Sequence, residues 1–314
     1  MQVQNDFLVS VAVITYNQKD FITQALESVL MQKTKFRFEI VIGDDASTDG
    51  TTQILENYIY RHPNKVKLLK SVANLGPMQN VVRTYKACSG KYIAVLEGDD
   101  FWTDENKLQD QVNLMEENQN LSMCFTNRNI VDVNGSVIRE KWVPPAYRRK
   151  LTCKEIITGF TPPTQTILFR KDLLDEELIN NLKKVYNGDI YISSVLSTKG
   201  DVGYVDKITA AYRINSDGIY GKEDYFRRLK NQVKTYQVLL SSLDNTYRKD
   251  IQRTQIRVKQ RLFVVSLLKG HLNYHLKMLI NLFIHDVQTP DYSLIRAFKL
   301  LLTKGVIPSK VITD

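Results

Sequence analysis

The sequence lacks the features that mark secreted, zinc-ribbon and membrane-spanning proteins. Its 314 residues include only three cysteines, Cys88, Cys124 and Cys153, and no Cys-x-x-Cys pair. This odd, scattered set indicates neither a disulfide framework nor a zinc ribbon, and it is typical of a reducing cytosol. The longest apolar stretches, such as 262–265 and 282–284, are too short to cross a bilayer. Residues 1–11 lack a basic stretch followed by an apolar run, so we expect no signal peptide.

Histidine and glycine are scarce where two enzyme classes would need them. His62 is the only histidine before residue 271, and no His-Glu-x-x-His pattern occurs, which argues against a zinc hydrolase. The segment Thr15–Asp20 contains no glycine, although a dinucleotide-dependent oxidoreductase needs a glycine-rich loop after its first strand. A Walker phosphate loop is also absent from the sequence.

The positive charge is concentrated in the C-terminal third of the chain. The formal net charge is +9, and the content of 43% hydrophobic and 25% charged residues is ordinary for a folded protein. Residues 221–314 contain 17 Lys and Arg against 7 Asp and Glu, whereas residues 1–220 are nearly neutral. By charge alone, this segment could contact nucleic acid or an anionic membrane, or it could present a solvated helical surface.

Short apolar strands alternate with helical periodicity in the first part of the chain. We predict strands at Val9–Thr15, Phe38–Ile42, Val66–Leu69 and Tyr92–Leu96, with amphipathic helices between them. This order implies a parallel sheet with helices on both faces, in which ligands bind at the carboxyl ends of the strands. Polar clusters follow the first, second and fourth strands, where that rule places a ligand.

The pattern changes after Met123. We predict a hairpin around Asn134-Gly135 and further strands at Thr166–Phe169 and Val202–Val205. Helical patterns dominate from Glu223 onward, so the C-terminal region is expected to be helical.

The strongest local signal for chemistry is the acidic sequence Leu96-Glu97-Gly98-Asp99-Asp100 at a strand end. Adjacent carboxylates after a buried strand repel each other unless a cation or hydrogen-bond donors neutralise them. A hard divalent cation bound through oxygen, with a diphosphate supplying further ligands, removes this conflict. A helix N-cap is the alternative, but one cap does not require three neighbouring acids.

Two other polar clusters are typical of nucleotide recognition. The segment Asp44-Asp45-Ala46-Ser47-Thr48-Asp49-Gly50-Thr51 contains a turn and a helix cap. One of its first two carboxylates could also accept a hydrogen bond from a base edge. The first strand ends in Thr15-Tyr16-Asn17, where a Tyr can stack on a nucleobase. Taken alone, Tyr16 is better explained as a surface residue.

In this order and spacing, the motifs resemble those of the family 2 glycosyltransferases with a GT-A fold. The resemblance covers residues 7–215 and rests on VAVITYN (11–17), DDASTDGT (44–51), NLG (74–76), GKYIA (90–94) and EGDDFW (97–102). It implies a Rossmann-like α/β fold with a mostly parallel central sheet, helices on both faces and a helical C-terminal extension. We expect a catalytic domain at 1–220, with a nucleotide-sugar-binding half (1–127) and an acceptor-binding half (128–220), followed by a basic helical region at 221–314.

The resemblance also implies a role for each motif. Asp100, together with Asp99, would bind Mn²⁺ or Mg²⁺. Asp189 would be the catalytic base, although from the sequence alone it would be the N-cap of a helix at Ile190–Ser197. Tyr16 would stack on the base. The residues expected to bind the nucleotide sugar are Thr15, Tyr16, Asn17, Asp44, Asp45, Asn74, Arg83, Glu97 and Asp99.

The sequence departs from the family pattern in several places. Relatives usually have Asp where this chain has Glu97, and many carry Arg where it has Val81, so that Arg83 would have to substitute. Glu-Asp is common where this chain has Gly188 before the Asp. Some relatives have a metal-facing His where this chain has Asn215, which would be a weaker ligand through its amide oxygen.

The implied activity is inverting transfer of a sugar from a nucleotide-diphosphate sugar to a hydroxyl of a glycan or lipid-linked acceptor, in bacterial cell-surface polysaccharide synthesis. UDP is the favoured nucleotide, with dTDP left open, and Trp142, residues 162–165 and Tyr186 are candidates for the acceptor site. We expect a cytoplasmic protein without a nucleic-acid partner. Its C-terminal helices could lie on the inner face of the plasma membrane, pack on the catalytic domain or form a homodimer. A non-catalytic nucleotide-sugar-binding scaffold is the alternative function, but the intact acidic motifs argue against it.

Overall fold

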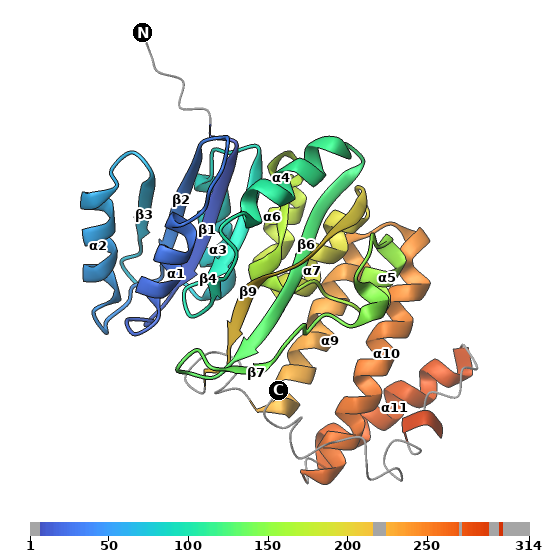
Figure 1. The fold of residues 1–314 in the computed structure, drawn as a ribbon. Coiled ribbons are helices and arrows are strands. Elements are labelled where there is room, and N and C mark those ends of the chain that lie inside the picture. The colour runs from blue at the N-terminus through green and yellow to red at the C-terminus, as the bar shows by residue number, and fades with distance from the viewer. Residues whose placement is uncertain (1–6, 216–223, 270–271, 289–294, 298–314) are drawn as a thin grey trace.

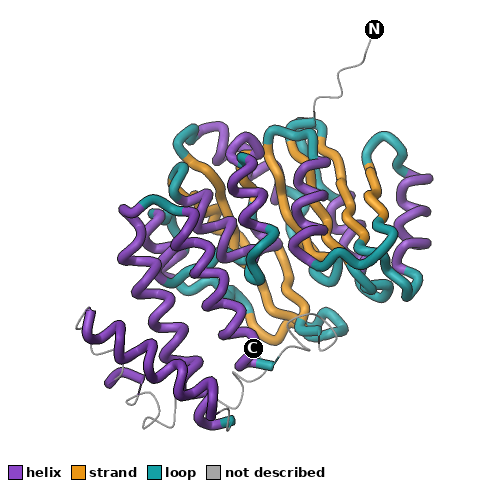
Figure 2. The backbone as a smooth tube through the Cα atoms, turned by 180° about the vertical axis from the view of Figure 1, so that it is seen from behind, coloured by secondary structure: helices purple, strands orange, loops and turns teal. Residues whose placement is uncertain are grey.

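The computed structural model describes residues 7–215, 224–269, 272–288 and 295–297. In these residues nine strands form one sheet, and helices cover both of its faces. Figures 1 and 2 show the N-terminal strands at one end of the sheet and the C-terminal helices beside the other end. The α/β fold class expected from the sequence is confirmed, together with the helical C-terminal region.

The N-terminal half of the sheet has the predicted parallel order. Strand β1 lies between β2 and β4, and β3 pairs with the outer side of β2. A helix follows each of the first three strands, as the alternating pattern predicts. In chain order these elements are β1 (Val9–Thr15), α1 (Ile22–Leu30), β2 (Phe38–Asp44), α2 (Thr51–Arg61), β3 (Val66–Lys70), α3 (Pro77–Ala87) and β4 (Tyr92–Glu97).

The second half of the sheet is mixed. Strand β8 lies antiparallel between β4 and β6, and β6 runs parallel to the long strand β9. The hairpin predicted around Asn134-Gly135 is confirmed as the β6–β7 pair. Strand β9 extends far beyond the predicted Val202–Val205, because the exposed residues Asp206 and Lys207 interrupt its apolar pattern. These strands are β5 (Phe101–Trp102), β6 (Leu121–Val131), β7 (Val137–Arg139), β8 (Leu168–Arg170) and β9 (Asp201–Arg213).

Short helices connect these strands and support the second half of the sheet. The α-helices are α4 (Lys107–Glu117), α5 (Cys153–Thr158), α6 (Glu176–Leu182) and α7 (Gly188–Ser197). The 3₁₀ helices are η1 (Pro145–Tyr147), η2 (Thr164–Thr166) and η3 (Lys171–Leu173).

Alternate residues of the central strands pack on opposite faces of the sheet. Val11 and Val13 of β1 belong to one hydrophobic cluster, whereas Ala12 belongs to the other. All three side chains are fully buried. A strand covered by helices on both faces favours apolar residues at nearly every position, which is why β1 is almost entirely apolar, with the buried Ser10 as an exception.

The described part of the C-terminal region packs against the rest of the chain. Leu229, Tyr236 and Phe263 share a hydrophobic cluster with Phe125 and Phe160. Packing on the preceding domain was one of the alternatives left open by the sequence. Within the described ranges, no helix is both long enough and apolar enough to cross a membrane. The helices are α9 (Tyr225–Ser242), α10 (Asn245–Leu268) and α11 (Leu272–Gln288).

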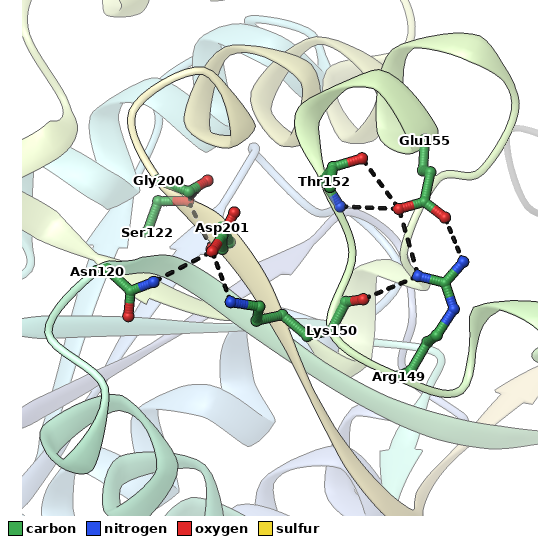
Figure 3. A network of polar contacts seen from close by, with 8 residues as sticks. All are labelled: Asn120, Ser122, Arg149, Lys150, Thr152, Glu155, Gly200 and Asp201. Atoms are coloured by element: carbon green, nitrogen blue, oxygen red, sulfur yellow. Dashed lines mark hydrogen bonds and ion pairs between the residues drawn. The ribbon is translucent and has the colours of Figure 1, made fainter.

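A polar network joins the amino ends of β6 and β9 to the segment before α5 (Figure 3). Asp201, the first residue of β9, pairs with Lys150 at 2.8 Å. Thr152 and Glu155 form a capping box at the start of α5. These amino ends lie opposite the carboxyl ends of β1, β2 and β4, so the network supports the fold and takes no part in the candidate site.

Candidate active site

The predicted polar clusters meet at one edge of the sheet. Thr15, Asp44 and Glu97 end the parallel strands β1, β2 and β4, and Thr15 lies directly opposite Asp44 in the strand register. Strand β9 ends at the same edge with Arg213, whose backbone N–H donates to Asp100 at 2.9 Å. Ligands of such sheets bind at the carboxyl ends of the strands, so this edge is the candidate site.

The loops after β1 and β2 are hydrogen-bonded to each other. Asn17 has a positive φ of 53° and donates its backbone N–H to Ser47 Oγ at 2.9 Å. Its side-chain Oδ1 accepts the backbone N–H of Thr48 at 2.8 Å. The backbone N–H of Gln18 donates to Thr51 Oγ1 at 3.0 Å. Ser47 and Thr48 therefore do more than form a turn, because they fix the shape of the loop that presents Tyr16.

Asp44 and Asp45 both hold neighbouring backbone in place. The buried Asp44 carboxylate accepts hydrogen bonds within its own turn, from Ser47 and from Thr52. The buried Asp45 carboxylate accepts the backbone N–H groups of Leu75 and Gly76, each at 2.9 Å. Asp45 therefore ties the loop after β3 to the end of β2, a structural task that the sequence did not predict.

The other expected nucleotide-binding residues surround this point. Asn74 lies in the loop that Asp45 holds, and its Oδ1 accepts the Gly76 N–H at 3.0 Å. Arg83 donates from Nη2 to the Asp44 carbonyl at 2.6 Å, and burial lowers the pKa of its guanidinium while Asp45 and Asp44 oppose the shift. Tyr16 is 45% exposed, as a residue that stacks on a ligand must be.

Gly98 brings the end of β4 against the loop after β1. A Cβ atom at this position would lie 2.4 Å from Gln18 Oε1 and 2.9 Å from Thr15 Oγ1, closer than real contacts allow. Both oxygen atoms are buried and accept or donate no hydrogen bond within the described chain. A glycine is therefore required in the acidic motif, and two polar atoms beside it are left for another partner.

The acidic motif is buried and electrostatically strained. Burial, followed by the charges of Asp99 and Asp189, raises the pKa of Glu97 to about 8. Burial and the charges of Asp99 and Glu97 raise the pKa of Asp100 well above its usual range. Burial raises the pKa of Asp99 as well, although Asn215 and Gln18 donate hydrogen bonds that oppose the shift. The carboxylates of Glu97 and Asp100 are thus destabilised by neighbouring acids, as the sequence predicted, whereas burial alone raises the pKa of Asp99.

Asp189 lies within electrostatic range of this motif. It is the second residue of α7, whereas Asn187 occupies the N-cap position, so the alternative role of Asp189 as the N-cap is wrong. Burial raises the pKa of Asp189. Its charge raises the pKa of Glu97, and the two carboxyl groups therefore lie near each other.

Two arginines that the sequence analysis did not single out stabilise the acids. Arg128 of β6 lies between the rings of Trp142 and Tyr212, 4.4 Å from each centroid, and it lowers the pKa values of Glu97, Asp100 and Asp189. Arg213 donates from Nε to the Asp99 carbonyl at 3.0 Å. A charged residue within an otherwise buried strand was the available sequence signal for Arg128.

The candidate site has an excess of negative charge that a divalent cation would neutralise. Among the described residues, four carboxyl groups, of Glu97, Asp99, Asp100 and Asp189, lie near two guanidinium groups, of Arg128 and Arg213. Glu97 Oε2 is buried and accepts no hydrogen bond from the described residues. Within those residues, no group of three or more His, Cys, Asp or Glu side chains forms a ready-made metal site. The residues thus fit a cation that takes most of its ligands from a bound molecule.

The sequence departures have structural explanations. A Cβ atom at Gly188 would lie 2.7 Å from the sulfur of Met78, so the Met78 side chain fills the space that a larger residue would need. Val81 is a partly buried residue packed on the core, and Arg83 reaches the end of β2 instead. Asn215 interacts with Asp99, which places it beside the acidic motif.

The candidate acceptor residues are placed in different surroundings. Trp142 packs on Phe160 and covers Arg128, so it is mainly a packing residue. Gln165 is fully buried and accepts a hydrogen bond from Arg128 Nη1 at 3.2 Å. Tyr186 is 53% exposed in the turn before α7.

The chain is similar to one protein-family model and to several known proteins. The family model for glycosyl transferase family 2 matches residues 10–177. An uncharacterized protein of Mycobacterium tuberculosis is 29% identical over 211 residues, which are 67% of this chain and 60% of that protein. This chain therefore spans about 60% of the length of that relative. The Escherichia coli enzyme UDP-Glc:alpha-D-GlcNAc-diphosphoundecaprenol beta-1,3-glucosyltransferase WfgD is 28% identical over 233 residues, 73% of this chain and 85% of that enzyme.

Solved structures have the same fold. The S. aureus TarS structure (residues 1–349) in complex with UDP-GlcNAc superposes with a TM-score of 0.60 at 19% identity, covering 93% of this chain and 90% of that one. The mannosyltransferase PcManGT from Pyrobaculum calidifontis, in complex with GDP-Man and Mn²⁺, superposes with a TM-score of 0.58 at 14% identity. This superposition covers 96% of this chain and 88% of PcManGT. At these identities the likeness concerns the fold.

Proposed function

Because the chain belongs to glycosyl transferase family 2, we propose that it transfers a sugar from a nucleoside-diphosphate sugar, preferably a UDP-sugar, to a hydroxyl group with inversion. One observation carries the proposal. Carboxyl groups from β4 and from the start of α7 share one buried electrostatic environment around Arg128, with more negative than positive charge. This shared environment supports the proposal of a catalytic base close to a cation site.

The proposed donor site is the surface made by the loops after β1, β2 and β3. Tyr16 would stack on the base, and the loop held by Asp45 would border its edge. The remaining proposed nucleotide-binding residues are Thr15, Asn17, Asp44, Asn74, Arg83, Glu97 and Asp99. UDP is favoured because WfgD is named for UDP-Glc and the TarS structure contains UDP-GlcNAc.

Asp100 is the proposed main ligand of Mn²⁺ or Mg²⁺, with Asp99 beside it. A divalent cation at this place would stabilise the negative charge that develops on the leaving diphosphate. Burial and neighbouring carboxylates make it costly for Asp100 to be charged by itself, so binding a cation there relieves an existing conflict. The Arg213 N–H holds one carboxylate oxygen of Asp100 at 2.9 Å and fixes its direction.

Asp189 is the proposed catalytic base. Its carboxylate would take the proton of the acceptor hydroxyl as that oxygen bonds to the anomeric carbon, while the bond from this carbon to the diphosphate oxygen breaks. A single displacement of this kind inverts the anomeric configuration. Burial raises the pKa of Asp189, which makes the carboxylate a stronger base, while hydrogen bonds from the backbone N–H groups of Ile190 and Asp189, and then the charge of Arg128, oppose the shift.

The proposed acceptor is a glycan or a lipid-linked sugar, and the proposed contact with the membrane is α11. Leu276, Ile280, Phe283 and Ile284 are each at least half exposed and recur on one face of this helix. Such a face can lie in the interface of an anionic membrane, to which the basic region 221–314 would be attracted. A homodimer through the same face is the alternative. The division into 1–127, 128–220 and 221–314 is proposed as a division of roles.

A test of the function compares the wild-type chain with Asp189→Asn. We expect the wild type to release UDP from UDP-glucose or UDP-GlcNAc in the presence of Mn²⁺, and the variant to lose this turnover by at least about 100-fold. Binding of UDP should be largely unchanged, because the substitution keeps the shape of the side chain. A near-normal rate in Asp189→Asn would remove Asp189 as the base. Donor binding without any turnover in the wild type, across a panel of nucleotide sugars and acceptors, would favour the scaffold alternative.

A further inference from the structure

Helix α9 of the C-terminal region packs against the turn that leads into α7. The two helices are in direct contact along the interior of the molecule. Tyr236 of α9 lies near the proposed base, because burial and then the charge of Asp189 raise the pKa of its phenol to about 12. The C-terminal region therefore reaches the candidate active site as well as the outer surface.

The contact is centred on the hydroxyl group of Thr235. Its Oγ1 atom accepts the backbone N–H of Tyr186 at 3.3 Å and that of Asn187 at 3.2 Å. Its own proton can be donated to Asn187 Oδ1 at 3.4 Å or to the Asn231 carbonyl at 3.3 Å. Thr235 has no exposed surface, so water cannot easily replace the hydroxyl group if it is removed.

This contact holds the two residues directly before α7. Asn187 occupies the N-cap position of α7, but its side chain makes no capping hydrogen bond to the helix. By contrast, the preceding helix α6 is capped by Asp175, which accepts the Leu178 N–H at 2.8 Å. The start of α7 is thus held from outside, by a side chain 48 residues further along the chain.

We propose that Thr235 is a positioning residue for Asp189. By binding two consecutive amides directly before α7, it sets the direction of the first helical turn, and hence the position of the Asp189 carboxylate relative to the acidic motif. The inference rests on the proposed function, since it assumes that Asp189 is the base. It assigns the C-terminal helices a part in catalysis that is separate from any membrane contact.

A purely structural role for Thr235 would have different consequences. Loss of packing at a buried site lowers the stability of the whole fold and weakens nucleotide binding and turnover together. Loss of positioning affects turnover while nucleotide binding is kept, because the proposed nucleotide site is built from β1, β2 and β3 loops that Thr235 does not contact.

The experiment uses the full chain with Thr235→Val, which keeps the shape but removes the hydroxyl, and Thr235→Ser, which keeps the hydroxyl. Turnover is measured as UDP release from UDP-glucose and UDP-GlcNAc with Mn²⁺, and UDP affinity by calorimetry. We expect Thr235→Val to lower kcat by about tenfold or more, since small misplacements of a catalytic group are costly. The Kd for UDP should stay within about twofold, and Thr235→Ser should restore most of kcat.

A second readout does not depend on activity. Amide hydrogen exchange over residues 185–190 should be faster in Thr235→Val than in the wild type, and close to the wild-type rate in Thr235→Ser. The matched control is Thr254→Val on α10, where another buried threonine donates to the Asp250 carbonyl at 3.0 Å. This control should leave kcat and the exchange over 185–190 unchanged. If Thr235→Val does not fold, Thr235→Ala replaces it in both measurements.

The proposal is overturned if the variant without the hydroxyl turns over normally, or if it loses UDP affinity in proportion to turnover. It is also overturned if exchange over 185–190 does not change, or if Thr254→Val has the same effect. Asp189→Asn, measured in parallel, distinguishes a failure of the proposed base from a failure of the proposed positioning role. Normal turnover in Asp189→Asn refutes the proposed base, whereas loss of turnover there with full activity in Thr235→Val refutes only the positioning role.

Discussion

At the residue scale, the account depends most on the carboxyl group of Asp100. It is 2% exposed, lies beside two other acids and receives one backbone hydrogen bond, from Arg213. We expect Asp100→Asn to lower turnover by at least about 100-fold and to weaken Mn²⁺-dependent UDP binding by about tenfold, because the cation loses its main protein ligand. Calorimetric titration of UDP with and without Mn²⁺ checks this. Asp110→Asn, in an acid that pairs with Lys207 on the surface, is the control; equal losses in both variants would contradict the assignment.

The raised pKa of Glu97 predicts that the stability of the fold depends on pH. Its pKa in the folded chain is raised to about 8, above the value near 4.3 of an unfolded chain. Protonation therefore favours the folded state, and this contribution to stability is complete below about pH 4 and is lost as pH rises towards 8. In the presence of EDTA, Tm should fall between pH 5 and 8 by several degrees more in the wild type than in Glu97→Gln. Parallel melting curves of the two proteins over this range would disprove it.

The sequence singled out the acids after β4, because three neighbouring carboxylates at a strand end exceed what a helix cap needs, whereas Asp189 was assigned only from the family resemblance. It did not predict Arg128 or Arg213, which balance them. Each lies in a long strand, and its partners come from distant segments: Trp142 and Tyr212 for Arg128, and the carbonyls of residues 99, 132 and 133 for Arg213. Local sequence patterns contain no information about such pairings.

At the scale of elements, the loop after β3 depends on Asp45. Its two oxygens accept the Leu75 and Gly76 N–H groups in a buried place. We expect Asp45→Ala to lower the free energy of unfolding by about 1–3 kcal/mol, because the Leu75 N–H loses its partner and the Gly76 N–H keeps only Asn74 Oδ1. Asp45→Asn keeps one acceptor oxygen and should cost less. Urea unfolding of the three proteins measures the difference, and an unchanged midpoint for Asp45→Ala would show that the loop is held by other contacts.

Helices and strands with a regular pattern of apolar residues were predictable. Those that are partly exposed, or held by distant residues, were predicted only in part. The four parallel strands were recognised because apolar residues dominate each of them, although polar residues such as Ser10, Glu39 and Lys67 occur within them. Strand β9 was recognised only in part, since Asp206 and Lys207 face solvent in its middle. The start of α7 was placed two residues late, because its N-terminus is held by Thr235 of another helix and not by a local cap.

At the scale of the whole molecule, the basic C-terminal region has two different sides. Its inner side packs on the catalytic part through residues such as Leu229 and Phe263, while α11 presents an apolar face outward. Charge and periodicity in the sequence could not separate these sides, because both contain apolar residues between cations. Only the packing of α9 and α10 against α5 and α7 shows which residues are buried.

The exposed apolar face of α11 predicts binding to anionic membranes. We expect the full chain to float with anionic vesicles in low salt, and less in high salt as the attraction of the basic region is screened. Ile280→Glu combined with Phe283→Glu should reduce the bound fraction several-fold, by removing apolar area and adding negative charge. Tyr60→Glu, at an 87% exposed residue of α2, is the control. If the double variant still binds the vesicles, α11 is not the membrane contact. If the molecular mass of the wild type rises with concentration and the same substitutions abolish this change, α11 forms a homodimer instead.

The central claim is that Asp100 and Asp189 face one bound nucleotide and its cation. Crystals grown with UDP and Mn²⁺, with diffraction data collected at the manganese absorption edge, test it directly. We predict one anomalous peak about 2 Å from an Asp100 carboxylate oxygen, in contact with the diphosphate and on the side of the sheet where Asp189 lies. A UDP molecule bound elsewhere, or a manganese peak with no oxygen of Asp100 or Asp99 among its ligands, would contradict the account.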